Sequence, residues 1–220
     1  DKEEKKKEKE KKDFSNIIKD IVKLNGIIDP NNLFTACKLG NLDLVKFIIS
    51  LNVIDVTKKY GDCMMFVFQA EIGYTILHFA CESGNLDLVK YIISLDKIDI
   101  ASISYKGRTI LHTACKSGNI DLVKFIVSLD KIDITSKTDK DESILHFACE
   151  SSNLDLVKYI VSLNKIDITS KNDNKKSILH IACESGNLDL VKYIISLNKI
   201  DITSKTCREE SILHIACESG

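Results

Sequence analysis

The sequence predicts an all-α solenoid, in which helix-turn-helix units stack side by side and short fingers resembling β-hairpins join them. The chain contains 5 histidines, and successive ones are always 34 residues apart: His78, His112, His146, His180 and His214. The apolar residues around each histidine recur with the spacing of two short helices. Helices of about ten residues are marginal alone in water, so each unit must bury its apolar faces on its neighbours.

Each unit carries signals for the start and end of both helices. A Ser or Thr suits the N-cap of the first helix, and a Gly suits the left-handed residue after it. The second helix opens at an Asn, with an Asp two residues later, and it ends at an Asp or Asn that tolerates a left-handed backbone. The predicted N-caps are Thr75, Thr109, Ser143, Ser177 and Ser211 for the first helices and Asn85, Asn119, Asn153 and Asn187 for the second.

The repeated motif is Thr/Ser-Ile-Leu-His-x-Ala-Cys, followed by Gly-Asn-Leu-Asp-Leu-Val-Lys. It resembles the ankyrin repeat, whose signature is Thr-Pro-Leu-His-x-Ala. The resemblance covers about residues 33–220. It implies an ankyrin-repeat solenoid, in which each histidine bonds to backbone between neighbouring units and is structural. One departure is Ser152, which stands where other units have Gly and marks the unit we expect to be weakest.

The predicted organisation places a charged leader, either helical or disordered, at residues 1–13. A capping helix and its turn follow at 14–32, and repeats occupy 33–220. The repeats divide into a degenerate first unit at 33–57, an extended insertion finger at 58–73, full units at 74–107, 108–141, 142–175 and 176–209, and a partial sixth unit at 210–220. Because the sixth unit stops after its first helix, we expect the chain to be a fragment of a longer array.

Composition and motifs argue against several classes of function. A net charge of −1 provides no field for nucleic acid, and no apolar run approaches the ~20 residues of a membrane span. No Gly-rich phosphate loop exists, so we expect no cofactor and no small-molecule substrate. The pair His-x-x-Cys could suggest zinc or a nucleophile, but it recurs in five units at a structural period. We therefore expect no catalytic residue and no metal site.

Six of the 8 cysteines each follow an Ala in an apolar helical stretch. Equivalent positions in stacked helices lie roughly 10 Å apart, beyond the reach of a disulfide. We therefore expect these six to be buried and reduced in a cytoplasmic protein. They are Cys37, Cys81, Cys115, Cys149, Cys183 and Cys217.

By resemblance, the expected function is that of a protein–protein interaction scaffold, which binds a partner protein through its concave face and finger tips. The alternatives are a regulatory segment of a larger enzyme or channel, whose functional domain lies elsewhere, and a purely structural spacer. The insertion either packs on its own unit or contacts the partner, and the variable tips are either merely solvated or binding. The candidate contacts are Tyr60, Met64, Met65, Phe66 and Phe68 in the insertion, and Tyr105, Arg108, Lys116, Lys140, Asp141, Asn174, Lys175 and Arg208 beyond it; the first helices add Glu82, Glu150 and Glu184.

Overall fold

The computed structural model describes residues 30–61 and 71–218, in which the chain forms eleven short helices. The expected leader, most of the expected capping region, and Met64, Met65, Phe66 and Phe68 of the insertion lie outside the described residues. The helices are α2 (Pro30–Lys38), α3 (Leu42–Ser50), α4 (Ile76–Glu82), α5 (Leu86–Ser94), α6 (Ile110–Ser117), α7 (Ile120–Ser128), α8 (Ile144–Glu150), α9 (Leu154–Ser162), α10 (Ile178–Glu184), α11 (Leu188–Ser196) and α12 (Ile212–Glu218).

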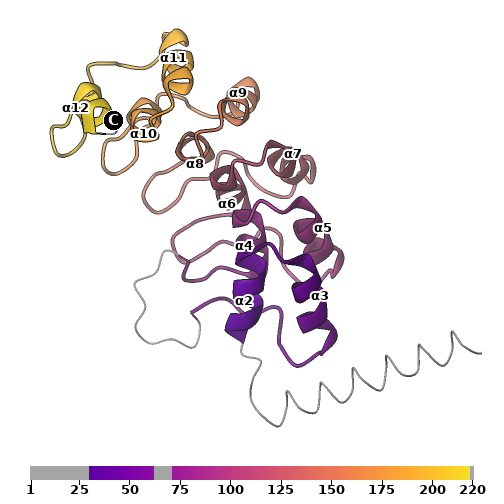
Figure 1. Ribbon diagram of the computed structural model, residues 1–220. Helices are drawn as coiled ribbons and strands as arrows, with labels where there is room; N and C mark the ends of the chain where they lie inside the picture. The colour runs from indigo at the N-terminus through magenta and orange to yellow at the C-terminus, as the bar shows by residue number, and fades with distance from the viewer. Residues whose placement is uncertain (1–29, 62–70, 219–220) are drawn as a thin grey trace, which may run out of the picture.

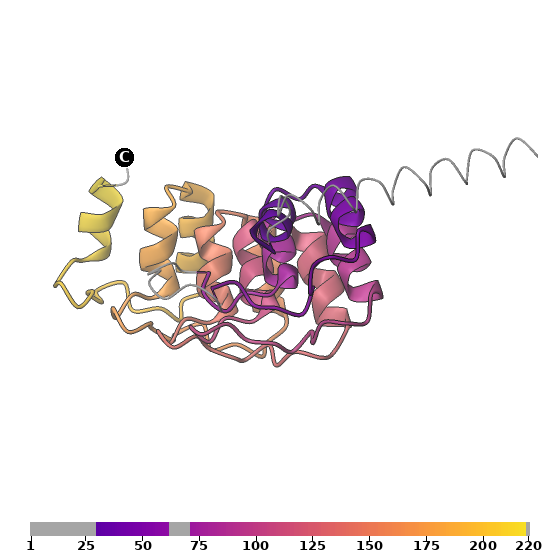
Figure 2. The ribbon, with the colours of Figure 1, turned by 90° about the horizontal axis from the view of Figure 1, so that it is seen from below.

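The helices form two curved layers (Figure 1). The first helices of the units, which carry the even numbers, make the inner layer, and the second helices make the outer one. The connecting fingers project together from one end of the helices, as Figure 2 shows from below. Within the described part of the chain, the fingers contain isolated antiparallel bridges, such as the one between Lys137 and Ser143, rather than longer strands. The predicted all-α solenoid is confirmed.

The caps explain why each helix begins where it does. Thr75 caps α4, where His78 takes the role that Glu or Gln plays in the usual capping box. Its ring Nδ1 accepts from the Thr75 N–H at 3.2 Å, and the same arrangement recurs in the next three units. The predicted left-handed ends of the second helices are also present, with φ between 51° and 53° at Asp96, Asp130, Asn164 and Asn198.

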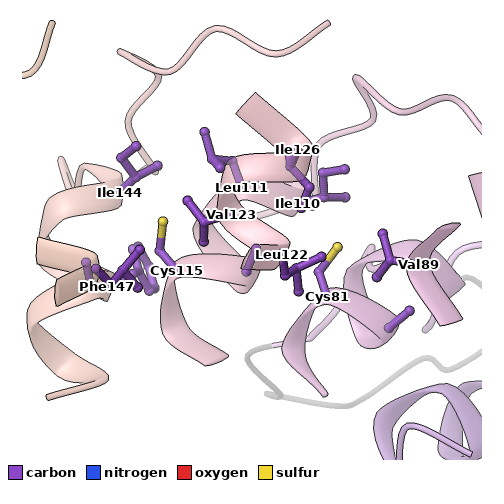
Figure 3. Close-up of a cluster of buried hydrophobic side chains, with 14 of the residues drawn as sticks. Cys81, Val89, Ile110, Leu111, Cys115, Leu122, Val123, Ile126, Ile144 and Phe147 are labelled. Atoms are coloured by element: carbon purple, nitrogen blue, oxygen red, sulfur yellow. The ribbon is translucent and has the colours of Figure 1, made fainter. Parts of the chain in front are cut away.

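The core runs without interruption from unit to unit (Figure 3). Leu122, Val123 and Ile126 of α7 are at most 1% exposed and pack behind the first helices. Five of the six cysteines predicted to be buried, Cys37, Cys81, Cys115, Cys149 and Cys183, are buried and free. The prediction is wrong for Cys217, which is exposed, because no described helix covers that side of α12.

A ladder of asparagines joins each unit to the one before it. Asn119 Oδ1 accepts from the N–H of Leu122 at 3.1 Å and caps α7, while its Nδ2 donates to the carbonyl of Gly84 at 2.8 Å. One side chain therefore satisfies a helix end and an orphan carbonyl of the neighbouring turn. The equivalent cross-unit bonds run from Asn85 to Gly40, from Asn153 to Gly118, and from Asn187 to Ser152.

A second ladder lies on the outer layer, where a lysine of each unit sits over an aromatic ring of the next. The Nζ atom of Lys90 is 5.6 Å from the centroid of the Phe125 ring. Such contacts are worth about 0.5–1 kcal/mol at exposed sites. The corresponding pairs are Lys46 with Tyr91, Lys124 with Tyr159, and Lys158 with Tyr193, at 5.5 to 5.8 Å.

Ser152 has φ of 59°, close to the values of 68° to 76° at Gly84, Gly118 and Gly186. A left-handed residue with a side chain costs roughly 1 kcal/mol. We therefore expect Ser152→Gly to raise the free energy of unfolding by up to about 1 kcal/mol, as measured by urea denaturation.

Gly186→Ala is the matched control for this prediction, because a Cβ at Gly186 would meet nothing within 4 Å. Its cost therefore reports backbone strain alone, and we expect a loss of about 1 kcal/mol. A lower free energy of unfolding for Ser152→Gly than for the parent would contradict the prediction that Ser152 strains the backbone at this turn.

Candidate functional site

The histidine column lies between the units, beneath the surface that a partner could reach. His78 is fully buried, and its Nε2 lies 3.1 Å from the carbonyl of Arg108 in the next unit. Because Nδ1 accepts from the Thr75 N–H, Nε2 carries the hydrogen and donates. The Nε2 atoms of His112, His146 and His180 are buried and form no hydrogen bond of ordinary geometry with a described residue.

The last histidine differs from the others. His214 lies in α12 and is exposed, although its Nδ1 makes the same contact with the capping hydroxyl as in the other units, at 2.6 Å from Ser211. The inter-unit hydrogen bond that the resemblance implies is therefore formed at His78 and is absent or weaker at the other four, as far as the described residues show.

Burial sets the protonation of the histidines and cysteines in this layer. It lowers the pKa of His78, His112 and His146 to about 4, so these rings are neutral near pH 7. It also raises the pKa of the neighbouring Cys81 and Cys115 thiols, which opposes formation of a nucleophilic thiolate. Across residues 30–61 and 71–218, no three His, Cys, Asp or Glu side chains are grouped so as to hold a metal ion.

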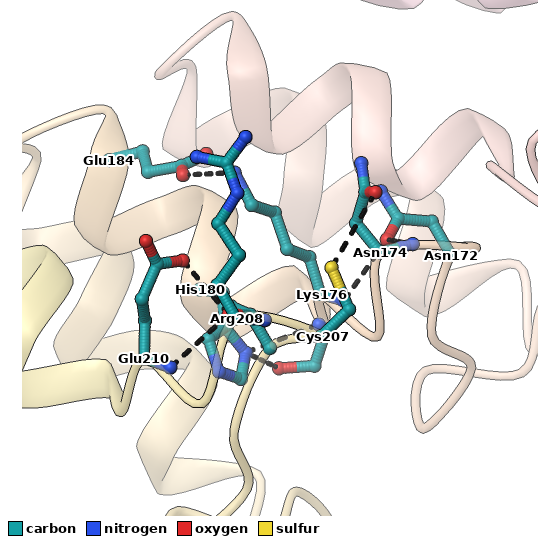
Figure 4. Close-up of polar contacts among 10 residues, drawn as sticks. Asn172, Asn174, Lys176, His180, Glu184, Cys207, Arg208 and Glu210 are labelled. Carbon is teal, nitrogen blue, oxygen red and sulfur yellow. Dashed lines mark hydrogen bonds and ion pairs between the residues drawn. The ribbon is translucent and has the colours of Figure 1, made fainter.

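The inner face is the surface made by two residues of each unit: the last charged residue of the first helix and the finger residue just before its N-cap. The first column holds Lys38, Glu82, Lys116, Glu150, Glu184 and Glu218, and the second holds Arg108, Glu142, Lys176 and Glu210. Tyr74 has the equivalent position in the second column but is only 1% exposed. Ion pairs cross this face between Lys116 and Glu82, at 3.6 Å, and between Lys176 and Glu184 (Figure 4).

Arg108 is held within the molecule. Its Nη1 donates to the Tyr74 hydroxyl at 3.1 Å, and its guanidinium carbon lies 5.0 Å from the centroid of the Phe147 ring. Its own carbonyl faces His78 Nε2 at 3.1 Å. The side chain therefore links three successive units. If Arg108 bound a partner, it would have to give up or share its contacts with Tyr74 and Phe147.

The fingers are joined edge to edge by one backbone hydrogen bond per neighbouring pair. The N–H of Asp139 donates to the carbonyl of Lys106 at 3.2 Å, and the N–H of Asp173 donates to that of Lys140 at 3.0 Å. Tyr105 is 60% exposed, with Lys59 Nζ 5.8 Å from its ring centroid. The structure thus places most of the predicted tip residues in one exposed row, namely Tyr105, Lys140, Asp141, Asn174, Lys175 and Arg208; Lys116 is exposed on the inner face.

Comparison with known families settles the nature of the array. A family model described as ankyrin repeats, in three copies, matches residues 11–104, 33–138, 96–172 and 145–220. The chain belongs to the ankyrin repeat family. No curated protein gives a comparable match. Within the described part of this ankyrin array, no helix is long and apolar enough to cross a membrane.

The ankyrin array has an aromatic pocket at the stem of the insertion. Phe34 stands where the other units carry the histidine, and its ring centroid lies 5.4 Å from that of Tyr60 and 5.5 Å from that of Phe79. The pocket has a volume of about 440 Å³, and the ion pair of Lys38 and Glu71 lies among its lining residues, at 3.2 Å. Tyr60 therefore packs against its own array while also lining a cavity.

The stem itself is closed by backbone hydrogen bonds. The Tyr60 N–H donates to the Tyr74 carbonyl at 2.7 Å, and the Gly73 N–H donates to the Tyr60 carbonyl at 2.8 Å. These two bonds pair the described residues on either side of the insertion, and further bonds tie them to the array, from Lys38 to Glu71 and from the Tyr105 N–H to the Ile72 carbonyl. Sequence reasoning missed the role of Phe34, although aligning the degenerate first unit with the others shows that Phe34 replaces the histidine.

Proposed function

We propose that this ankyrin array is a scaffold that holds a partner protein against its inner face and finger tips. Ankyrin repeats are generally protein–protein interaction modules. The observation that carries the proposal is a difference between two sets of side chains. Those that form the contacts between units are of the same type in each unit, whereas exposed side chains change from unit to unit.

The stacking contacts use the same residue type in every unit. Asn occupies each rung of one ladder, and Lys over Tyr or Phe occupies each rung of the other. By contrast, the first inner-face column changes from Lys38 to Glu82 to Lys116 and is Glu in the later units. The exposed finger tips of those later units change instead, from Lys140 to Asn174 to Arg208. Since stacking does not require this variation, it gives each unit a different exposed surface. An extended surface of this kind is what repeat proteins use to bind partners.

The five buried free cysteines support placing the protein in a reducing compartment, and we propose the cytoplasm. Burial raises the pKa of the Cys37 thiol to about 12, so it stays protonated and unreactive. Cell fractionation of the protein in its source cells tests this location.

Replacing one tip residue on each of three adjacent fingers, with Tyr105→Ala, Lys140→Ala and Asn174→Ala together, should weaken partner binding about tenfold or more. The reason is that these exposed side chains lie in one row and are not rungs of the stacking ladders. Quantitative mass spectrometry of proteins retained by the immobilised full chain measures the effect.

The control carries Lys97→Ala, Lys131→Ala and Lys165→Ala, three exposed changes after the ends of the second helices. We expect it to retain the partner. If the full chain enriches no protein over a blank resin, the array is a spacer and the proposal fails.

A third variant, which lacks Cys63–Phe68, separates the two roles left open for the insertion. Lost stability with unchanged partner binding indicates that the insertion only packs on its own unit, whereas lost binding indicates that it contacts the partner.

A further inference from the structure

We propose that the inner face from α8 to α12 docks a basic segment of the partner protein, and that an Arg or Lys side chain of this segment pairs with Glu150. This inference rests on the proposed function and adds the chemistry of the partner. It follows from which charges of the inner face are already paired, and from the sign of those that are not.

Most charges at the ends of the first helices are matched within the array. Lys38 pairs with Glu71 at 3.2 Å, Lys116 pairs with Glu82 at 3.6 Å, and Lys176 pairs with Glu184. Glu150 and Glu218 are the exceptions: neither forms an ion pair or a side-chain hydrogen bond with a residue in the described part of the chain, and of the two only Glu150 lies within the stack rather than on α12. Glu150 is exposed near the middle of the inner face, between Lys116 and Glu184 in its column.

The surroundings of Glu150 are acidic on one side. From Glu142 onward, the two columns contain Glu142, Glu150, Glu184, Glu210 and Glu218, and Lys176 is the one base among them. The earlier part of the same columns holds Lys38, Arg108 and Lys116 with Glu82 as its one acid. The whole chain has a net charge of only −1. The separation of acidic and basic side chains on the inner face therefore results from where they are placed, not from an excess of acidic residues in the chain.

Some neighbours of Glu150 raise the pKa of its carboxyl, and others lower it. Desolvation raises the pKa of its carboxyl above the ordinary value, and the Glu142 and Glu184 carboxylates raise it further. Lys116 and Arg108 oppose this effect, but Lys116 is paired with Glu82, and Arg108 is held by Tyr74 and Phe147. A cation brought by a partner would relieve this repulsion, whereas an acidic segment would increase it.

A recess beside this strip suits such a side chain. It lies between α10, α12 and the last finger, and has a volume of about 220 Å³. Ile215 supplies an apolar wall, and the charged lining residues are three acids, Glu184, Glu210 and Glu218, and two bases, Lys176 and Arg208. Lys176 is already paired with Glu184, and neither Glu210 nor Glu218 has an ion pair with a described residue. Figure 4 shows Lys176 reaching across to Glu184 here, with Glu210 beside Arg208. Arg and Lys bury an aliphatic stem and keep the charged head near carboxylates, which matches this lining.

The test is selection of a random 16-residue peptide library on the immobilised full chain, followed by affinity measurements on selected peptides. We expect the enriched peptides to carry several Arg or Lys residues, and their affinity to fall as salt is raised. The double variant Glu142→Gln with Glu150→Gln should weaken them by about tenfold or more. The control Asp155→Asn with Asp189→Asn removes the same charge from the outer layer and should leave the affinity unchanged.

The outcomes separate this inference from the proposed function. Enriched peptides that are acidic or uncharged, or basic peptides that bind the double variant as well as the parent, overturn the basic segment while leaving the scaffold in place. Complete failure of the library to yield a binder counts against both. The charge reversal Glu150→Lys gives an independent check, because it should abolish enrichment of basic peptides while the circular dichroism spectrum remains that of the parent.

Discussion

Lowering the pH from 7 to 4 should destabilise the array by roughly 3 kcal/mol for each of His78, His112 and His146. Their pKa lies near 4 in the folded chain and near 6.5 when unfolded. A histidine with a lowered pKa contributes stability above the unfolded value, and this contribution is lost as the pH falls toward the folded value. The loss therefore occurs between about pH 6.5 and 4, where the unfolded chain binds protons that the folded chain cannot accept.

Urea denaturation at half-unit steps between pH 7 and 4 measures this loss. The variant His112→Gln should show a shallower dependence, by about 1.4 kcal/mol per pH unit in the middle of the window. Asp133 and Asp167 contribute only near the acid end of this window: hydrogen bonds from Thr135 and Thr169 lower the pKa of their carboxyls below the ordinary value of 3.8, so the stability they add begins to be lost below about pH 5. The comparison with His112→Gln removes this background, because both proteins retain these carboxyls. Free energies of unfolding that stay level from pH 6.5 to 4.5 would show that the column does not remain neutral.

Asn119→Ala should lower the free energy of unfolding by about 2–4 kcal/mol, the second of the largest effects. The substitution removes the N-cap acceptor of α7, worth about 1 kcal/mol, and also leaves the Gly84 carbonyl without its donor, at about 1–3 kcal/mol. Chemical denaturation measures the sum of the two contributions.

Asn119→Asp separates the two contributions. It keeps an acceptor for the Leu122 N–H but cannot donate to Gly84, and it sets a carboxylate against that carbonyl. We expect it to lose the cross-unit part while retaining the cap. If Asn119→Asp were as stable as the parent, the asparagine ladder would contribute nothing to stacking.

The sequence was informative wherever a feature depends on one unit alone. The period of 34 residues, the Ser and Thr caps, and the positive φ at Asp96 and Ser152 follow from local patterns and are present in the structure. The burial of the cysteines depends on neighbouring units, and the prediction from the pattern was wrong for one of them: Cys217 occupies the same position as Cys183, but no described helix follows α12 to cover it.

The contacts between units could not be predicted from the repeat pattern. Asn119 could be recognised as a cap, but its second bond depends on the distance to Gly84 in the stacked array. The same holds for the candidate site. The sequence offered Arg108 as an exposed anchor, and stacking places it against Tyr74 and Phe147; it offered Glu150 as one of several acids, and only the pairing of the others sets it apart.

Each rung of the asparagine ladder joins a unit only to the one that precedes it. Duplication of one 34-residue segment within the gene would therefore create a complete new rung, together with its lysine–aromatic pair, without altering any existing one. Loss of a segment would close the ladder again in the same way. The length of the array can thus change during evolution in whole steps, and each added step brings two inner-face positions that are free to diverge.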